Sequence, residues 1–179
     1  MTTTALRAMK RRGQKIAMLT AYDYPTAKLI DRAGIPLLLV GDSVGTAVLG
    51  YETTVPVTVE DIVHHTQAVT RAVERALVVA DMPFMSYRID QAETMRTAMR
   101  LMQEGGAHAV KLEGAGSTVD VVSKLVESGI PVMTHIGLTP QSVYQFGGYR
   151  VQGKRPQGAA RILEDCLLYT SDAADDLTR

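Results

Sequence analysis

The sequence predicts an α/β protein whose strands form a mostly parallel sheet. Two observations lead to this fold class. A short apolar run followed by a longer amphipathic stretch recurs along the chain, and some of these runs are continuously apolar, as in strands buried on both faces. The 179 residues, 46% of them hydrophobic, amount to one domain that can bury a sizeable core. Because no low-complexity linker interrupts the pattern, we expect consecutive βα units without a second domain.

Five apolar runs are the candidate strands, at residues 16–20, 36–40, 76–80, 109–113 and 131–135. The segments between them have the spacing of amphipathic helices, as in the apolar positions through residues 121–126. A last helical stretch is expected after Pro156. The pattern therefore predicts about five βα units.

Helix-start signals indicate where three of the helices begin. Asp23 is a candidate N-cap with Pro25 just inside the helix, and Thr58 with Asp61 three residues later is a variant of the capping box. Asp90 opens the helix of the third unit. We expect the inner face of that helix to consist of Met95, Ala98, Met99 and Met102.

Charge and cysteine content exclude several classes of protein. The 19 basic and 19 acidic residues balance, which argues against a nucleic acid or an anionic membrane as the main partner. The apolar runs are far shorter than the roughly 18 residues of a membrane span, and no secretory signal is visible. A single cysteine, Cys166, excludes a disulfide scaffold and a zinc ribbon. We therefore expect a soluble cytoplasmic protein that acts on a small molecule.

Polar side chains follow or end the candidate strands. Asp42, Asp81, Glu113 and His135 each lie where a strand passes into its loop, and Lys111 precedes Glu113 by two residues. Because all carboxyl ends of a parallel sheet lie on one face, these residues should meet there. Three carboxylates in one place repel each other unless a cation neutralises them, and Mg²⁺ is the natural candidate. Mg²⁺ could then polarise the keto group of a bound 2-oxo acid and stabilise its enolate.

Each of these residues also has a simpler interpretation. Asp42 or Asp81 alone could be a helix N-cap, although a long loop rather than a helix start is expected after each. Lys111 could form a Schiff base, bind a carboxylate or form an ion pair. Its position on the same strand face as Glu113 favours the last two roles. His135 could be a general acid or base, or a hydrogen-bonded core histidine.

Seven segments of the chain resemble the ketopantoate hydroxymethyltransferase family, in order and with the family's spacing, from about Met9 to Asp165. They read MLTAYDY at 18–24, LVGDS at 39–43, TVPVT at 54–58, ADMPF at 80–84, VKLEG at 110–114, HIGLTPQS at 135–142 and GGYRVQG at 147–153. The resemblance implies a (β/α)8 TIM barrel of the phosphoenolpyruvate/pyruvate type. The implied reaction transfers a hydroxymethyl group from 5,10-methylenetetrahydrofolate to 3-methyl-2-oxobutanoate, which gives 2-dehydropantoate for pantothenate and coenzyme A biosynthesis.

Carried over position by position, the resemblance implies Mg²⁺ at Asp42, Asp81 and Glu113. It implies contacts between the 2-oxo acid and Asp42, Ser43, Asp81 and Lys111, with Lys111 facing the anionic end of the substrate. His135 becomes a pocket residue and a candidate catalytic group. The family also forms symmetric homo-oligomers.

A complete barrel of this type needs about 250 residues, so we expect residues 1–165 to be the N-terminal part of a single barrel domain. The resemblance places the glutamate that accepts the proton at the end of the sixth strand, outside this chain, which is therefore expected to be inactive by itself. Residues 166–179 resemble the translation of a sequencing adapter, so Cys166 should have no functional role. Two alternatives are another Mg²⁺-dependent 2-oxo acid aldolase or lyase, and a non-catalytic fragment.

Overall fold

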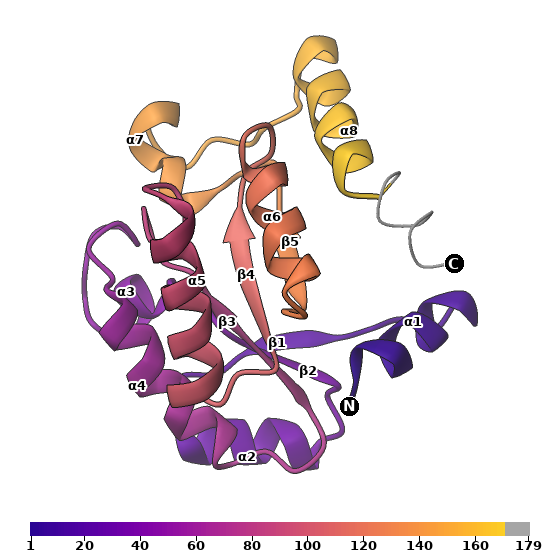
Figure 1. Ribbon diagram of the computed structural model, residues 1–179, viewed down its shortest axis with the longest axis vertical. Coiled ribbons are helices and arrows are strands. Elements are labelled where there is room, and N and C mark those ends of the chain that lie inside the picture. Colours follow the sequence, from indigo (N-terminus) through magenta and orange to yellow (C-terminus); the bar gives the residue numbers. More distant parts are fainter. Residues whose placement is uncertain (171–179) are drawn as a thin grey trace.

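The computed structural model describes residues 1–170 and is built around a five-stranded parallel sheet (Figure 1). The strands are β1 (Met18–Thr20), β2 (Leu37–Val40), β3 (Leu77–Asp81), β4 (Ala109–Glu113) and β5 (Val132–His135). Their order in the sheet is their order in the chain, and each neighbouring pair is parallel. Doubly wound sheets reverse their strand order at a switch point, whereas barrels do not. The predicted parallel α/β fold is confirmed.

Helices connect the strands, and α2, α4, α5 and α6 each link one strand to the next. The helical elements are α1 (Thr3–Arg11), α2 (Tyr24–Arg32), α3 (Val44–Ala47), α4 (Val59–Thr70), α5 (Gln91–Met99) with its π-helical continuation η1 (Arg100–Glu104), α6 (Thr118–Glu127), the 3₁₀ turn η2 (Pro140–Ser142), α7 (Val143–Phe146) and α8 (Pro156–Thr170). None of the helices within residues 1–170 is long and apolar enough to cross a membrane.

The predicted helix caps are present. The side chain of Asp23 accepts a hydrogen bond from the main-chain N–H of Thr26 at the start of α2. Thr58 and Asp61 form a reciprocal capping box at the start of α4, and Asp90 caps α5. These caps satisfy main-chain donors that have no partner inside the helix.

Two details differ from the sequence-based expectations. Met99 is 45% exposed, and the buried stripe of this helix consists of Thr94, Thr97, Ala98 and, in η1, Leu101. The other three predicted positions do face the core, since Ala98 is buried and Met95 and Met102 pack against the main core cluster. In addition, the short helix α3, rather than a long loop, starts directly after Ser43.

The two faces of the sheet bury different sets of side chains. Outward-facing residues such as Leu38, Val78 and Val110 form the main core with the helices. Inward-facing residues form a smaller cluster, Leu37, Leu77, Val79 and Ala109, on which Leu6 of α1 packs. This alternation follows from the period-2 geometry of strands. It places every second residue of β3 and β4, Asp81 and Glu113 included, on the inner face.

The outer strands have fewer neighbours than the central ones. β1 pairs only with β2, and Met18 and Leu19 of β1 are 39% and 47% exposed. α8 has no buried residue and lies apart from the sheet, although the Tyr169 hydroxyl donates a hydrogen bond to the Gly114 carbonyl (Figure 1). Of the predicted tail, residues 166–170 continue α8, and residues 171–179 lie outside the described residues.

Asp31, at the end of α2, binds the chain where it enters β3. Its carboxylate accepts hydrogen bonds from the main-chain N–H groups of Glu74 at 3.2 Å, Arg75 at 3.1 Å and Ala76 at 2.7 Å. Burial alone would raise the pKa of Asp31, but these donors and the Arg75 guanidinium outweigh it and hold the pKa below its usual value. The sequence did not single out this residue.

Candidate functional site

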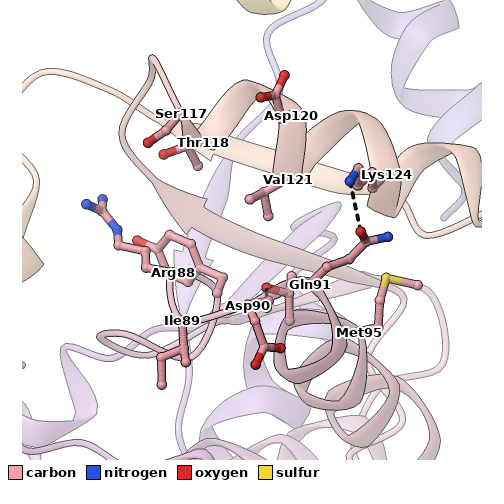
Figure 2. A pocket seen from close by; sticks show the side chains of 12 residues that line it. Arg88, Ile89, Asp90, Gln91, Met95, Ser117, Thr118, Asp120, Val121 and Lys124 are labelled. Carbon is pink, nitrogen blue, oxygen red and sulfur yellow. Dashed lines mark hydrogen bonds between the residues drawn. The ribbon is translucent and has the colours of Figure 1, made fainter.

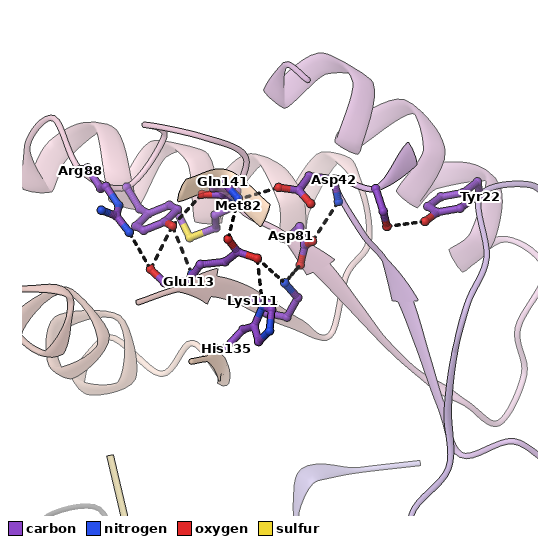
Figure 3. A network of polar contacts seen from close by, with 11 residues as sticks. Tyr22, Asp42, Asp81, Met82, Arg88, Lys111, Glu113, His135 and Gln141 are labelled. Atoms are coloured by element: carbon purple, nitrogen blue, oxygen red, sulfur yellow. Dashed lines mark hydrogen bonds and ion pairs between the residues drawn. The ribbon is translucent and has the colours of Figure 1, made fainter. Parts of the chain in front are cut away.

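The register of the strands brings the predicted site residues together (Figure 3). Asp81 is directly opposite Lys111 in the β3–β4 pair, and Glu113 is opposite His135 in the β4–β5 pair. Lys111 and Glu113 share a strand face because they are two residues apart. All four side chains therefore lie on the inner face at the carboxyl ends of their strands, where the apolar cluster ends.

Asp42 and Ser43 reach the same place from the turn after β2. The main-chain N–H of Asp42 donates a hydrogen bond to Asp81 Oδ2 at 2.9 Å, and Ser43 Oγ lies 2.6 Å from the hydroxyl of Tyr22. A Cβ atom at Gly41 would lie 2.8 Å from Ser43 Oγ and 3.4 Å from Asp81 Oδ2. A side chain at this position would therefore displace the Ser43 hydroxyl. The side chain of neither aspartate caps a helix, so the N-cap interpretation is wrong for both.

Lys111 is the positive centre of the cluster. Its Nζ lies 2.9 Å from Asp81 Oδ1 and 3.9 Å from Glu113 Oε1, and its side chain is only 9% exposed. Burial alone would lower the pKa of Lys111, but the Asp81 carboxylate, and those of Glu113 and Asp42, raise it above the usual value. A lysine held in its charged form is a poor nucleophile. This geometry favours the ion-pair or anion-binding role over a Schiff base.

Asp42 is a buried acidic group whose charge is poorly balanced, and the same holds for Asp81, whose pKa burial raises despite the nearby Lys111. Asp42 is 3% exposed, and its one side-chain partner is Gln141, whose Nε2 donates to Asp42 Oδ2 at 2.9 Å. Burial, followed by repulsion from Asp81, raises the pKa of Asp42 to about 7. A cation beside Asp42 would remove this penalty.

Glu113 is buried and fully engaged. Its Oε1 lies 2.9 Å from Nδ1 of His135, and its Oε2 accepts the main-chain N–H of Gln141 at 3.0 Å. Its carbonyl oxygen accepts from the guanidinium of Arg88 at 2.9 Å. His135 keeps 38% of its side chain exposed, so it lies at the rim of the cluster and not in the core. The core-histidine interpretation of His135 is therefore not supported.

Sequence reasoning missed three residues of this network. Gln141 bonds to both Asp42 and Glu113, the Tyr87 hydroxyl lies 2.7 Å from Gln141 Oε1, and Tyr22 orients Ser43. Gln141 and Tyr22 lie inside segments that resemble the family, which was the available signal. Their partners are distant in sequence, so spacing alone could not identify them.

The cluster as it stands is not a closed metal cage. Within residues 1–170, no group of three or more His, Cys, Asp or Glu side chains is arranged to hold a metal ion directly. The net charge of the cluster is nevertheless negative when its groups are ionised, because three carboxylates surround one ammonium group. Oxygen ligands and surplus negative charge suit a hard divalent cation such as Mg²⁺.

A separate cavity lies between the loop after β3 and the helices α5 and α6 (Figure 2). Its volume is about 270 Å³. Across it, Lys124 Nζ donates to Gln91 Oε1 at 2.8 Å. Tyr87 lines this cavity and also bonds Gln141, so the cavity and the carboxylate cluster share one wall. No predicted site residue lines it.

Comparisons with solved structures identify the fold class. The crystal structure of phosphonopyruvate hydrolase in complex with oxalate and Mg²⁺ matches with a TM-score of 0.61 and 13% identity, covering 99% of this chain and 76% of that chain. Phosphoenolpyruvate phosphomutase from Streptomyces platensis subsp. rosaceus matches with a TM-score of 0.58 and 18% identity, covering 76% of this chain and 54% of that one. With the sequential parallel sheet, these matches confirm the predicted barrel class, of which this chain has five βα units.

Sequence comparisons are more specific. The 3-methyl-2-oxobutanoate hydroxymethyltransferase of Thermoanaerobacter sp. (strain X514) is 59% identical over 163 residues, or 91% of this chain and 60% of that protein. The chain thus spans about 60% of the length of this curated relative. A family model described as ketopantoate hydroxymethyltransferase matches residues 1–175. Given this match and the convergence of the strand-end residues, the chain belongs to the ketopantoate hydroxymethyltransferase family.

Proposed function

We propose that the strand-end cluster binds Mg²⁺ and a 2-oxo acid. We propose further that it serves the transfer of a hydroxymethyl group from 5,10-methylenetetrahydrofolate to 3-methyl-2-oxobutanoate. The observation that supports this most is the convergence of Asp42, Asp81 and Glu113 around Lys111 at the carboxyl ends of adjacent strands. Parallel βα barrels have their active sites at this end. The name of the matched relative favours this reaction over the lyase alternative.

The residues present fit Mg²⁺. His135 and a main-chain N–H bind Glu113, whereas Asp42 and Asp81 keep a buried and incompletely compensated charge, because burial raises the pKa of both even though Lys111 pairs with Asp81. Mg²⁺ retains water and binds through one or two carboxylates and its substrate, so it does not require a preformed three-carboxylate cage. Asp42 and Asp81 would hold the ion, with Glu113 as the third acidic group of the set.

Bound Mg²⁺ supplies a Lewis acid that polarises the keto group and favours formation of the enolate. The side chains of this chain bind and orient the substrate. Lys111 provides the positive charge for its carboxylate, and the Ser43 hydroxyl, held by Tyr22, provides a further hydrogen bond. A buried ammonium group is suited to this role because the low-dielectric surroundings strengthen its attraction to an anion.

Formation of the enolate requires a base that removes the proton from carbon 3. Asp81 is paired with Lys111, and Glu113 is engaged by His135 and Gln141. His135 uses Nδ1 toward Glu113, which leaves its other ring nitrogen for proton transfer. We expect the 179-residue chain to bind the 2-oxo acid with little or no turnover. The proposal includes folate binding and self-association.

Calorimetric titration of the chain with 3-methyl-2-oxobutanoate, with and without Mg²⁺, tests this proposal. Binding is expected only with Mg²⁺, and it should disappear when EDTA is added. A second assay adds 5,10-methylenetetrahydrofolate and measures 2-dehydropantoate, for which a low rate is expected. A folded chain that binds no 2-oxo acid in the presence of Mg²⁺ would refute the proposal.

A further inference from the structure

Gln141 lies at the centre of the cluster, where both its side-chain amide and its main-chain N–H make hydrogen bonds. It is 5% exposed. Its side-chain Nε2 donates to Asp42 Oδ2 at 2.9 Å and to the carbonyl of Met82 at 3.0 Å, and its Oε1 lies 2.7 Å from the Tyr87 hydroxyl (Figure 3). Its main-chain N–H donates to Glu113 Oε2 at 3.0 Å. One residue thus joins the ends of three neighbouring strands.

The local structure explains why this main-chain N–H is available. Gln141 is the second residue of the 3₁₀ turn η2, which begins with Pro140. The first N–H groups of a helical turn have no acceptor inside it and must find one elsewhere. Here that acceptor is the buried carboxylate of Glu113.

The partners of the amide also dictate its orientation. Asp42 Oδ2 and the Met82 carbonyl can only accept hydrogen bonds, so the amino group has to face them, and the amide oxygen then faces the hydroxyl of Tyr87. The reversed amide would oppose oxygen to oxygen at both places. The side-chain amide of Gln141 therefore has one orientation, and its hydrogen bond fixes the orientation of the Asp42 carboxylate.

We propose that Gln141 is the positioning residue that holds Asp42 and Glu113 in the orientation that binds the divalent cation and the 2-oxo acid. This inference rests on the proposed function. The amide of Gln141 holds Asp42 Oδ2, so the carboxylate cannot rotate and the direction of its other oxygen, Oδ1, is fixed. Binding then costs less conformational entropy, as expected when the groups around a ligand-binding carboxylate fix its geometry.

The variant Gln141→Met tests the inference because methionine has a similar length but no hydrogen-bonding amide. The probe is oxalate, a stable dianion with the adjacent oxygens of a 2-oxo acid, titrated calorimetrically into the 179-residue chain with Mg²⁺. The expected loss of affinity is roughly 10- to 100-fold. The matched control is Gln67→Met. Gln67 lies in α4, outside the cluster, and its Nε2 also donates to a main-chain carbonyl, that of Glu104, at 3.0 Å. This control should bind oxalate as the wild type does.

A second variant distinguishes positioning from a general loss of stability. Tyr87→Phe removes the hydroxyl that faces Gln141 Oε1 and that also bonds the main-chain N–H and carbonyl of Glu113, and it should weaken oxalate binding less than Gln141→Met does. Because part of the effect of Tyr87 passes through Gln141, the double variant should lose less affinity than the sum of the two single losses. Urea unfolding of each variant establishes that the titrated protein is folded.

Two results would overturn the inference in distinguishable ways. Unchanged oxalate affinity in Gln141→Met would refute the positioning role and leave the proposed function intact. Absence of Mg²⁺-dependent oxalate binding by the folded wild-type chain would instead refute the proposed function, and the positioning role with it.

Discussion

Asp31 and Asp42 are both buried, being 5% and 3% exposed, yet the protein shifts their pKa values in opposite directions. Burial favours protonation of Asp31, but three main-chain N–H groups and Arg75 outweigh it and lower the pKa. Asp42 has one amide partner, and burial and the neighbouring Asp81 raise its pKa to about 7. The comparison shows that the partners of a carboxylate, and not burial alone, decide whether its charge stabilises the fold.

The two residues also lie at opposite ends of the sheet. Asp31 binds residues 74–76, where the chain enters β3, and Asp42 follows the carboxyl end of β2. In βα barrels the amino end of the strands contributes stability and the carboxyl end contributes chemistry. Substitutions at the two ends should therefore separate stability from binding.

Lys111→Met should have the largest effect, because Lys111 belongs to the binding end but also neutralises buried charge. Removing one partner of a buried ion pair typically lowers the free energy of unfolding by about 3–5 kcal/mol. Urea unfolding at pH 7 measures this loss. The control Arg100→Met breaks the surface pairs with Glu60 and Glu104 and should cost about 1 kcal/mol or less. Equal losses in the two variants would contradict the buried role of Lys111.

Asp42→Asn should separate binding from stability. We expect the Mg²⁺-dependent affinity for 3-methyl-2-oxobutanoate to fall about 100-fold, which corresponds to about 2.7 kcal/mol. The free energy of unfolding should stay the same or rise, because a neutral amide relieves the repulsion from Asp81. Titration calorimetry and urea unfolding measure the two quantities. Wild-type affinity in this variant would contradict the proposal that Asp42 binds the cation and the substrate.

Asp31→Asn should have the converse effect. An amide oxygen cannot replace a carboxylate that accepts three N–H groups, so the free energy of unfolding at pH 7 should fall by about 2 kcal/mol. Ligand affinity measured on the folded variant should match the wild type. A loss of ligand affinity without a loss of stability would contradict the idea that the amino end of the sheet contributes stability and the carboxyl end contributes binding.

The pH dependence of the Asp31 contribution is the smallest expected effect. Because the pKa of Asp31 is lowered in the folded chain, its contribution should be complete above the unfolded pKa of about 3.9 and disappear as the pH falls through the folded pKa. The stability difference between wild type and Asp31→Asn should therefore be constant from pH 7 to about pH 5 and shrink below about pH 4. A difference that grows on acidification would contradict the lowered pKa.

Much of the candidate site could be predicted from short-range patterns. Strand ends and the two-residue alternation identified Asp42, Asp81, Lys111, Glu113 and His135, because a parallel sheet collects its carboxyl ends on one face whatever their separation in sequence. The helix caps were predictable for a similar reason, since a cap bonds to a group only three residues away. The inner face of the helix after Asp90 was also predictable except at Met99, which is exposed.

By itself the sequence determined the order of the βα units, the family and the acidic residues that end the strands. Only the tertiary structure decided which partners those residues have. The Gln141–Asp42 bond joins residues 99 positions apart, and the Asp31 bonds span 43 to 45 positions. Such bonds depend on how loops fold over the ends of the sheet, which no local periodicity encodes. The main-chain hydrogen bonds lower the pKa of Asp31, whereas the single bond from Gln141 does not offset the burial of Asp42 and the repulsion from Asp81.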